Sequence, residues 1–248
     1  MSISPRVLVI PSWYPSAEAP TAGIFIREQV AALSSACDVA VLHVDAGRAA
    51  SAAAVTVEDG VTVIRSAIDA ASLPMRFFGY RRAGIEAFER LRDEWGMPDI
   101  IHVQALWPAA MIARAISRRY DIPYVVTEHS EEYLAQSERR LVRTPGMLPL
   151  VLRPLARGAA RTIAVSRFLG DRLVELGLAS DPVVIPNVVP LSEASPLTTA
   201  VPHVIAHVSV MGPAKNLPGL LHAIDTLRAR RDDFVLCLAG DGERRAEA

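Results

Sequence analysis

Short, β-branched apolar runs alternate with longer helical patterns along most of this chain, and this alternation restricts the fold more than any other feature. Strands are predicted at 7–10, 39–44, 61–65, 100–103, 124–127, 162–165 and 183–185, and helices at 24–34, 76–95, 109–119 and 168–176. Strands that alternate with helices are typical of β–α–β units on a parallel sheet. The near-continuous apolar runs "RVLVI" and "YVVT" fit strands that are covered on both faces. The sequence therefore predicts the α/β class.

A proline-rich segment divides the chain. "PNVVPLSEASPLTTAVP", residues 186–202, has four prolines among Ser, Thr and Ala, which is typical of a linker. After it come a strand at 203–210, a helix at 217–230 and a strand at 233–240. One β–α–β unit cannot cover both faces of a parallel sheet. We therefore predict a complete domain at 1–186, a linker at 187–202 and the opening part of a second domain at 203–248.

The composition excludes several classes of protein. Hydrophobic residues make up 51% of the chain and charged residues 21%, which argues against disorder, and the net charge of −1 argues against a nucleic-acid partner. No apolar run reaches the ~18 residues that a membrane span needs, and "RVLVI" is too short for a signal peptide. Cys37 and Cys237 lie far apart in apolar contexts, which predicts buried free thiols in a reducing compartment. These features predict a cytoplasmic protein.

In open parallel sheets, ligands bind outside the carboxyl ends of the strands. The long loop "PSWYPSAEAPTAG" follows the first predicted strand, and Trp13 in it is a candidate for lining a pocket. The loop ends at Gly23, where a helix begins, so an anion could approach free backbone amides there. The alternative is that Gly23 serves only as a helix cap.

Two further strands end in candidate residues. After the fourth strand, Trp107 could line a pocket or be a core aromatic, and His102 within the strand is expected to be buried and hydrogen-bonded. After the fifth strand, Glu128, His129 and Ser130 follow one another, and three polar groups in succession suit a cleft better than a core. Ser130 could instead cap the next helix, and this would leave His129 free to act.

Lys215 is the single lysine of a chain with 25 arginines. It stands near the start of the predicted helix at 217–230, where its charge opposes the helix dipole. A cation is favourable there if an anion such as a diphosphate is held between the lysine and the helix amides, and the alternative is an exposed turn lysine.

Several motifs are absent. The sequence has no Asp-x-Asp, no G-x-G-x-x-G after a strand, no Walker A motif and no G-x-S-x-G elbow. The six histidines and two cysteines show no metal-ligand spacing. We therefore expect no metal and no dinucleotide cofactor.

Taken together, the motifs resemble the retaining GT-B glycosyltransferases of family 4. The matching pieces occur in the family's order and cover nearly the whole chain: "SWYPSAEAPTAGIFIREQ", "PDIIHVQALWP", "PYVVTEHS", "TIAVSRFLGDRL", "VVIPNV" and "HVSVMGPAKNLPGLLHAI" with "LCLAGDGE". The resemblance implies two Rossmann-like domains, with a glycan or lipid-linked acceptor mainly on the first and a nucleotide-sugar donor, such as a UDP- or GDP-sugar, mainly on the second.

The resemblance also implies roles for single residues. His129 matches the histidine that hydrogen-bonds the donor sugar near the reaction centre, Gly23 matches the glycine of the first loop, and Lys215 matches the lysine that neutralises the donor diphosphate. Such charge stabilisation needs no metal. Ser166 and Asn187, in matching segments, become candidates for donor binding. Trp13, Trp107 and Glu128 become candidates for the acceptor side or the pocket wall.

The sequence also departs from the family pattern. Val210 stands where many members have an arginine, and Asn187 is followed by Val-Val-Pro rather than Gly-Val-Asp. The family's Glu-x7-Glu motif does not follow Lys215, and the pair Glu86 and Glu94 has this spacing by coincidence on a charged helix face. The expectation is an incomplete donor pocket. The alternative to a glycosyltransferase is a non-catalytic module that binds the acceptor or a partner, and a sugar-nucleotide epimerase ranks below both.

The segment "ERRLVRTPGMLPLVLRPLARGAAR", residues 138–161, combines six arginines with many leucines. A basic, apolar surface could contact anionic lipid, which would place the protein at the inner face of the membrane. The alternative, which we favour slightly, is a packed helix pair whose arginines reach water.

Overall fold

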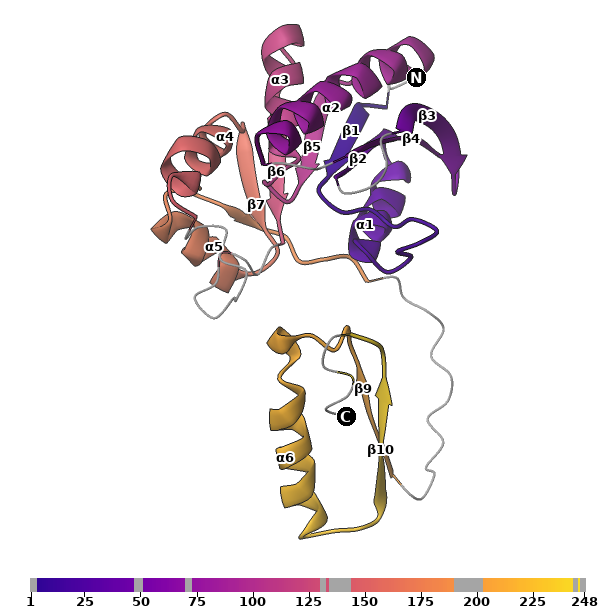
Figure 1. Cartoon of the computed structure of the whole chain (residues 1–248), viewed down its shortest axis with the longest axis vertical. Coiled ribbons are helices and arrows are strands. Elements are labelled where there is room, and N and C mark those ends of the chain that lie inside the picture. The colour runs from indigo at the N-terminus through magenta and orange to yellow at the C-terminus, as the bar shows by residue number, and fades with distance from the viewer. Residues whose placement is uncertain are drawn as a thin grey trace. The chain divides into compact units, whose positions relative to one another are not determined.

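The computed structural model describes residues 4–46, 51–69, 73–129, 133, 144–189, 203–242 and 245. The chain divides into two compact units, Met1–Pro190 (unit 1) and Leu191–Ala248 (unit 2). Figure 1 shows unit 1 in indigo to orange and unit 2 in yellow. Most of the predicted linker lies outside the described residues.

Unit 1 is built on one eight-stranded sheet. Its strands, in chain order, are β1 Arg6–Pro11, β2 Asp38–Ala46, β3 Ser51–Glu58, β4 Val61–Ile68, β5 Ile100–Gln104, β6 Tyr124–Glu128, β7 Arg161–Ala164 and β8 Val183–Val184. The order across the sheet is β3-β4-β2-β1-β5-β6-β7-β8. All neighbouring pairs are parallel except β3 with β4. The predicted α/β class with a parallel sheet is confirmed.

The edge strand β3 was not predicted. Its first half is Ser-Ala-Ala-Ala, which has a low preference for strands, so the β-branched signal is confined to the short run Val55–Val57. The turn that joins β3 to β4 contains Asp59 and Gly60, both with positive φ (51° and 80°). An Asp-Gly pair between two strands is the strongest local hairpin signal, so the turn could have revealed the antiparallel edge.

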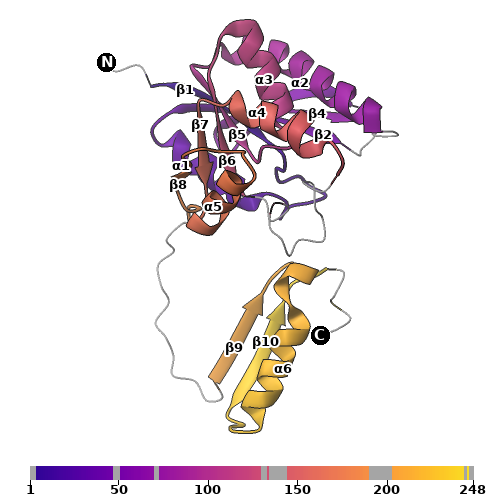
Figure 2. The same ribbon diagram turned by 90° about the vertical axis from the view of Figure 1, so that its left-hand side faces the viewer.

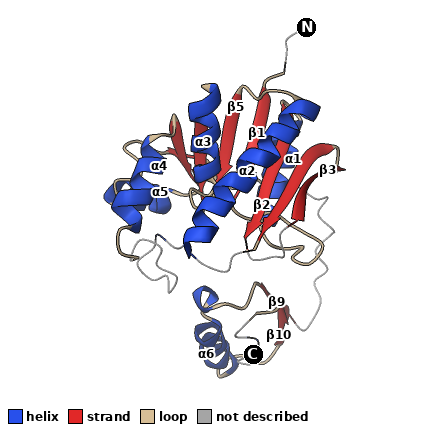
Figure 3. Cartoon of the chain, turned by 45° about the horizontal axis from the view of Figure 1, so that its top comes forward, coloured by secondary structure: helices blue, strands red, loops and turns tan. Residues whose placement is uncertain are grey.

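Helices cover both faces of the sheet (Figure 3). Successive residues of the buried strands are apolar and point to opposite faces, so both faces need to be covered. On β1, Val7 and Val9 pack with α1, Ile24–Ser34. Leu8 and Ile10 belong to the larger core on the opposite face. That core also contains residues of α2, Leu73–Trp95, and of α3, Ala110–Tyr120.

The remaining helices of unit 1 precede and follow β7. They are the π-helix η3, Met147–Leu152, and the α-helices α4, Arg153–Arg157, and α5, Arg167–Glu175. The four helices predicted at 24–34, 76–95, 109–119 and 168–176 are all present, with bounds that differ by up to three residues, and η3 and α4 lie in the segment 138–161, for which a helix pair was the favoured alternative. Where α2 meets α3, a Cβ at Gly84 would lie 2.4 Å from Ile112 Cδ1, so a glycine is needed for their close approach.

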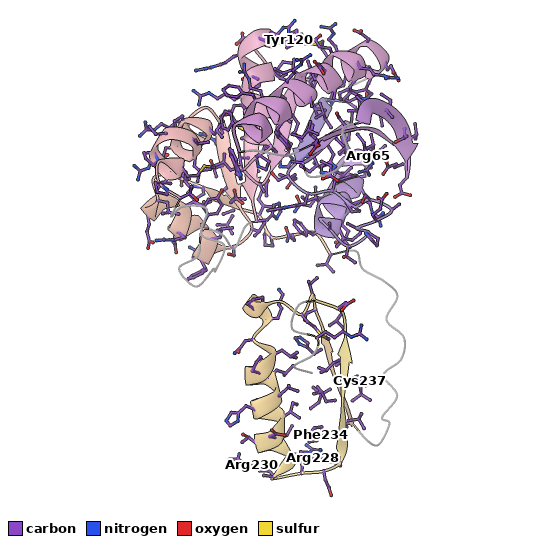
Figure 4. All side chains as sticks on the ribbon, viewed as in Figure 1. Arg65, Tyr120, Arg228, Arg230, Phe234 and Cys237 are labelled. Atoms are coloured by element: carbon purple, nitrogen blue, oxygen red, sulfur yellow. The ribbon has the colours of Figure 1, made fainter. Side chains whose placement is uncertain are left out.

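Unit 2 contains β9, His203–Val208, the 3-10 helix η4, Pro213–Lys215, then α6, Leu217–Arg228, and β10, Phe234–Ala239. The two strands are parallel and α6 runs along them (Figure 2). Exposed and partly buried residues alternate along both strands, so one face of this small sheet is bare. Cys237 of β10, labelled in Figure 4, is exposed, whereas Cys37 is partly buried. The prediction that both thiols are buried is therefore wrong for Cys237.

None of the helices in the described part of the chain is long and apolar enough to cross a membrane.

Candidate functional site

The strand order of unit 1 reverses between β1 and β5, which is the position where open parallel sheets bind ligands. The chain leaves β1 toward β2 on one side, whereas β5 lies on its other side, so the connections after β1 and β5 diverge from the carboxyl ends of adjacent strands. Ser12 joins the two loops: its hydroxyl lies 3.0 Å from the carbonyl oxygen of Ala105 and 2.9 Å from that of Trp107, can donate its one proton to either, and accepts from the amide of Ala109. The loops after β1 and β5 are therefore held together at the carboxyl ends of these two strands.

Gly23 lies at the start of α1, at the end of the loop that follows β1. Its φ is 68°, and a Cβ there would lie only 2.5 Å from the carbonyl oxygen of Trp13. No side chain caps the helix, and its first turn has no acidic residue. Both sequence hypotheses remain compatible with this geometry, because the glycine is a helix cap and also leaves the amides of the first turn without a side-chain cap.

Gly23→Ala is expected to lower the free energy of unfolding of unit 1 by about 1–3 kcal/mol, because it adds a left-handed backbone strain and a clash with Trp13. The matched control is Gly60→Ala, which has φ +80° but nothing within 4 Å of the new methyl group. Urea unfolding followed by tryptophan fluorescence would measure both. Equal losses in the two variants would show that the close approach to Trp13 contributes nothing.

Strand alternation brings five polar or aromatic side chains together on the α1 face of the sheet. Residues two apart on a strand share a face, so His102 and Gln104 of β5 lie on one side, as do Thr127 of β6 and His129 just beyond it. The ring of His129 packs against that of Phe25 of α1, with centroids 4.8 Å apart. The predicted site histidine is therefore held between β5, β6 and the first turn of α1.

A hydrogen-bonded chain connects His129 to the end of unit 1. His129 Nε2 lies 2.6 Å from Gln104 Oε1, Gln104 Nε2 donates to Gln29 Oε1 (3.0 Å), and Gln29 Nε2 donates to Asn187 Oδ1 (2.8 Å). Gln104 is fully buried. The chain thus joins two of the predicted site residues, His129 and Asn187, through two glutamines that were not predicted.

His102 lies beside this chain. Its Nε2 atom is 2.7 Å from Thr127 Oγ1 and 3.3 Å from Gln104 Nε2. The expectation that His102 is hydrogen-bonded is confirmed. Burial lowers its pKa to about 4, so the ring is neutral near neutral pH.

The pKa of His129 is also lowered to about 4. The main cause is burial, the second is the nearby His102, and the side chain of Asn187 opposes both. His129 is therefore a neutral imidazole near neutral pH, which can donate from one ring nitrogen and accept at the other. Its Nδ1 atom is buried and has no hydrogen-bond partner of normal geometry among the residues that the structure describes, so the polar contact with Asn187 that raises the pKa is not a formed hydrogen bond to this atom.

Glu128 points to the opposite face of β6 and supports the site from behind. Only 1% of it is exposed. Its Oε2 accepts from the amide of Leu106 and its Oε1 from the amide of His129, both at 2.9 Å. The carboxylate thus fixes the loop after β5 and the backbone of the site histidine. Its predicted role on the wall of a pocket stays a prediction, and so does that of Ser130, which lies outside the described residues.

The other predicted residues of unit 1 also follow strands at this edge. Trp13 is 37% exposed in the loop after β1. Trp107 packs partly on the core, with its ring centroid 6.0 Å from that of Phe77. Ser166 caps α5 by accepting from the amide of Leu169 (3.2 Å), so its position after β7 already has a structural explanation. Donor or acceptor binding by these residues stays a prediction.

Lys215 belongs to unit 2. It is the exposed last residue of η4, and Asn216, with φ 47°, separates it from α6. The turns after β9 and β10 meet nearby: the amide of Met211 donates to the carbonyl oxygen of Asp241 (2.9 Å), and a Cβ at Gly242 would lie 2.7 Å from Met211 O. Lys215 therefore stands beside a backbone-lined turn at the carboxyl edge of the small sheet.

Two other predictions concern surface segments. Glu86 and Glu94 form ion pairs with Arg82 and Arg90 on the exposed side of α2, which confirms that their spacing is that of a charged helix face. Of the basic segment 138–161, residues 138–143 lie outside the described part. Within the rest, Leu152 and Leu155 are buried, whereas Leu150 is 76% exposed, so contact with a membrane stays a prediction.

A surface hollow of about 460 Å³ lies between the end of α4, the start of β7 and the loop after α5, and Arg157, Arg161 and Asp181 are in its lining. It is at the amino ends of the strands, opposite the edge where ligands of open parallel sheets bind. None of the predicted site residues lines it. We therefore place the candidate site at the carboxyl edge.

The residues missed by the sequence analysis are Ser12, Gln29 and Gln104. Gln104 carries a signal that could have been used: in the buried run "IIHVQ", two polar residues two positions apart must share one face of the sheet. Gln29 gives no such signal, because a polar residue on a surface helix is ordinary.

Comparisons with known proteins agree with this fold. A family profile described as "Glycosyl transferase 4-like domain" matches residues 21–188, more than half of the chain. A search of curated proteins gave no match.

Three solved structures illustrate the likeness of the fold. Sucrose-phosphate synthase from Thermosynechococcus elongatus is 14% identical with a TM-score of 0.55, and the match covers 94% of this chain and 70% of that one. The catalytic domain of starch synthase IV from Arabidopsis thaliana, bound to ADP and acarbose, is 13% identical with a TM-score of 0.59. That match covers 98% of this chain and 69% of that one. A UDP-forming α,α-trehalose-phosphate synthase from Burkholderia xenovorans is 13% identical with a TM-score of 0.60. That match covers 98% of this chain and 66% of that one.

At these identities the likeness shows the fold alone, and it is that of the GT-B glycosyltransferases. The family match begins at residue 21 and covers Gly23, the strand that carries Gln104 and the segment that contains His129 and Asn187. This chain therefore belongs to the family of proteins with a glycosyl transferase 4-like domain.

Proposed function

We propose that this protein is a retaining GT-B glycosyltransferase of family 4, which transfers a sugar from a nucleotide-sugar donor to a glycan or lipid-linked acceptor. The observation that carries the proposal is the position of His129: a neutral, hydrogen-bonded imidazole at the carboxyl edge of the sheet, against the first turn of α1. A neutral imidazole at such an edge can hydrogen-bond a sugar hydroxyl without a competing charge.

The donor class is supported by unit 2 and by the relatives of similar fold. Lys215 is exposed beside the backbone-lined turn, and we propose that it pairs with the diphosphate of a nucleotide-sugar. The starch synthase structure contains ADP, and the trehalose-phosphate synthase is UDP-forming. We propose that lysine and backbone amides stabilise the leaving diphosphate electrostatically, without a metal.

In the proposed reaction, the acceptor hydroxyl attacks the anomeric carbon from the same face that the nucleoside diphosphate leaves. The bond from the anomeric carbon to the diphosphate oxygen breaks, the bond to the acceptor oxygen forms, and the leaving phosphate takes the hydroxyl proton. The anomeric configuration is then retained. His129 would bind the donor sugar beside this centre, and Gly23 would let the reacting groups approach the start of α1.

A second candidate function is a non-catalytic module that binds an acceptor or a partner. One observation favours it: the apolar Val210, 65% exposed, stands five residues before Lys215, where many members of the resembled family have an arginine. The two functions differ in whether the 248-residue chain binds a nucleotide-sugar.

Thermal unfolding of the whole chain with UDP-, GDP- and ADP-sugars would test the proposal. One of them is expected to raise Tm, because at about 100 Kd a ligand adds about 2.7 kcal/mol. In a chain of this size this corresponds to a rise of roughly 5–10 °C.

Lys215→Met should reduce the shift, since this exposed side chain would be lost without loss of packing. The matched control is Arg230→Met, another exposed cation of unit 2 that follows the end of α6. No shift with any of the donors would contradict donor binding by this chain and leave the binding module as the better account.

A further inference from the structure

The direction of the hydrogen bonds around Gln104 determines what His129 can offer to a substrate. Gln104 uses its amide nitrogen toward Gln29 Oε1 at 3.0 Å and toward His102 Nε2 at 3.3 Å. Its only oxygen then faces His129 Nε2 at 2.6 Å. A carbonyl oxygen cannot donate, so a neutral His129 must carry its proton on Nε2.

The neighbouring bonds agree with this direction. Gln29, which accepts from Gln104, donates its own amide group to Asn187 Oδ1 at 2.8 Å. His102 Nε2, which faces the amide group of Gln104, can accept the hydroxyl proton of Thr127 at 2.7 Å. Both glutamine amides in the chain therefore donate with the nitrogen and accept with the oxygen, and neither faces a group of the same kind.

We propose, on the basis of the proposed function, that Gln104 is a positioning residue that holds neutral His129 in its Nε2–H tautomer, so that Nδ1 is presented as a hydrogen-bond acceptor for a substrate hydroxyl. Nδ1 is buried and has no hydrogen-bond partner among the described residues. A buried acceptor without a partner is rare in folded proteins, and a bound hydroxyl would supply the missing donor. The ring is held in place by Phe25 on one side and by the Glu128 carboxylate at its backbone amide.

The consequence concerns specificity. An acceptor nitrogen binds a hydroxyl that can donate, and it does not bind a group that can only accept, such as a methoxy or fluoro substituent in the same place. The opposite tautomer would present Nδ1–H as a donor, which could bind an acceptor-only substituent as well as a hydroxyl. Gln104 would thus determine whether Nδ1 of His129 accepts from or donates to the sugar, although Gln104 does not contact the sugar itself.

Nuclear magnetic resonance of the whole chain labelled with ¹⁵N-histidine would test the tautomer directly. Two-bond ¹H–¹⁵N correlations distinguish the Nε2–H and Nδ1–H forms, and loss of the signal in His129→Asn assigns it. In the native chain at neutral pH we expect the Nε2–H pattern for His129. His43, a buried histidine on β2 whose pKa is also lowered to about 4, is an internal reference in the same spectrum.

Two variants of Gln104 then separate positioning from packing. Gln104→Leu keeps a similar volume but cannot accept, so the Nε2–H pattern should be lost. Gln104→Glu keeps an acceptor oxygen, so it should preserve that pattern and raise the pKa of His129, whose titratable neighbours are His102 and Glu128. The signal of His43 should not move in either variant.

A milder variant guards against a failure to fold. Gln29→Leu, on α1, removes the acceptor that orients the Gln104 amide and should increase the Nδ1–H fraction of His129. An Nδ1–H pattern in the native chain, or a His129 spectrum that is the same in both leucine variants as in the native chain, would overturn the inference. Because the spectra need no donor, the tautomer can be established even if nucleotide-sugars fail to bind, and the two proposals can fail separately.

Discussion

Acidification from about pH 7.5 to about pH 5 is expected to remove roughly 6 kcal/mol from the stability of unit 1. Three histidines on or next to its sheet, the buried His43 and the partly buried His102 and His129, have pKa values that desolvation lowers from 6.5 to about 4. At pH 5 the unfolded chain binds these protons and the folded chain does not, which costs about 2 kcal/mol for each histidine.

The sign follows from the direction of the shifts. A group whose pKa is lower in the folded state binds protons more readily when the chain is unfolded, so its stabilisation is complete above pH 6.5 and is lost as the pH falls toward 4. The expected loss is a large part of the total stability of a domain, about 5–15 kcal/mol.

Urea unfolding at several pH values, followed by tryptophan fluorescence, would measure this effect. The three tryptophans, Trp13, Trp95 and Trp107, all lie in unit 1, so the signal reports that unit. His43→Gln should reduce the slope of stability against pH by about a third, as one of three such groups. His222→Gln, at an exposed position of α6 in unit 2, is the matched control. A slope that is unchanged by His43→Gln would contradict the prediction.

Glu128→Ala is expected to lower the free energy of unfolding by about 2–5 kcal/mol, because it leaves two buried backbone amides without their acceptor. These are the amides of Leu106 and His129, each 2.9 Å from a carboxylate oxygen. In a chain of this size the loss corresponds to a fall in Tm of roughly 5–15 °C, which calorimetry would detect.

Two variants sharpen this measurement. Glu128→Gln keeps one acceptor oxygen and should lose about half as much stability. Glu86→Ala, which removes an exposed partner of Arg82, should cost less than about 1 kcal/mol. If Glu128→Ala were no more harmful than Glu86→Ala, the carboxylate would not be holding the loop after β5, and the support of His129 would need another explanation.

The fold could be predicted from the sequence wherever burial imposes a pattern. Central strands such as β1 and β6 are apolar on both faces, so their runs stand out, and the helices between them have ordinary amphipathic spacing. The edge strand β3 was not predicted, because an edge strand need not be apolar and because its alanines have no strong preference for a strand. The turn at Asp59 and Gly60 was the available clue.

For the candidate site, the sequence was sufficient to select His129, since a histidine directly after a buried strand must emerge at the carboxyl edge. It could not show what the histidine contacts. Gln29 and Gln104 are 75 residues apart, and they meet only because α1 covers the face of β5 on which Gln104 lies. Such a pairing depends on which helix covers which face, and no local pattern encodes it.

The sequence by itself determined the α/β class, the order of most elements, the family resemblance and the polar residues that follow the strands, because each depends on local composition and spacing. Only the tertiary structure decided that Glu128 accepts from the backbone amides of Leu106 and His129, and that Gly23 is required by the carbonyl oxygen of Trp13. It also decided which nitrogen of His129 is occupied. These are distances between residues brought together by packing, and periodicity along the chain carries no information about them.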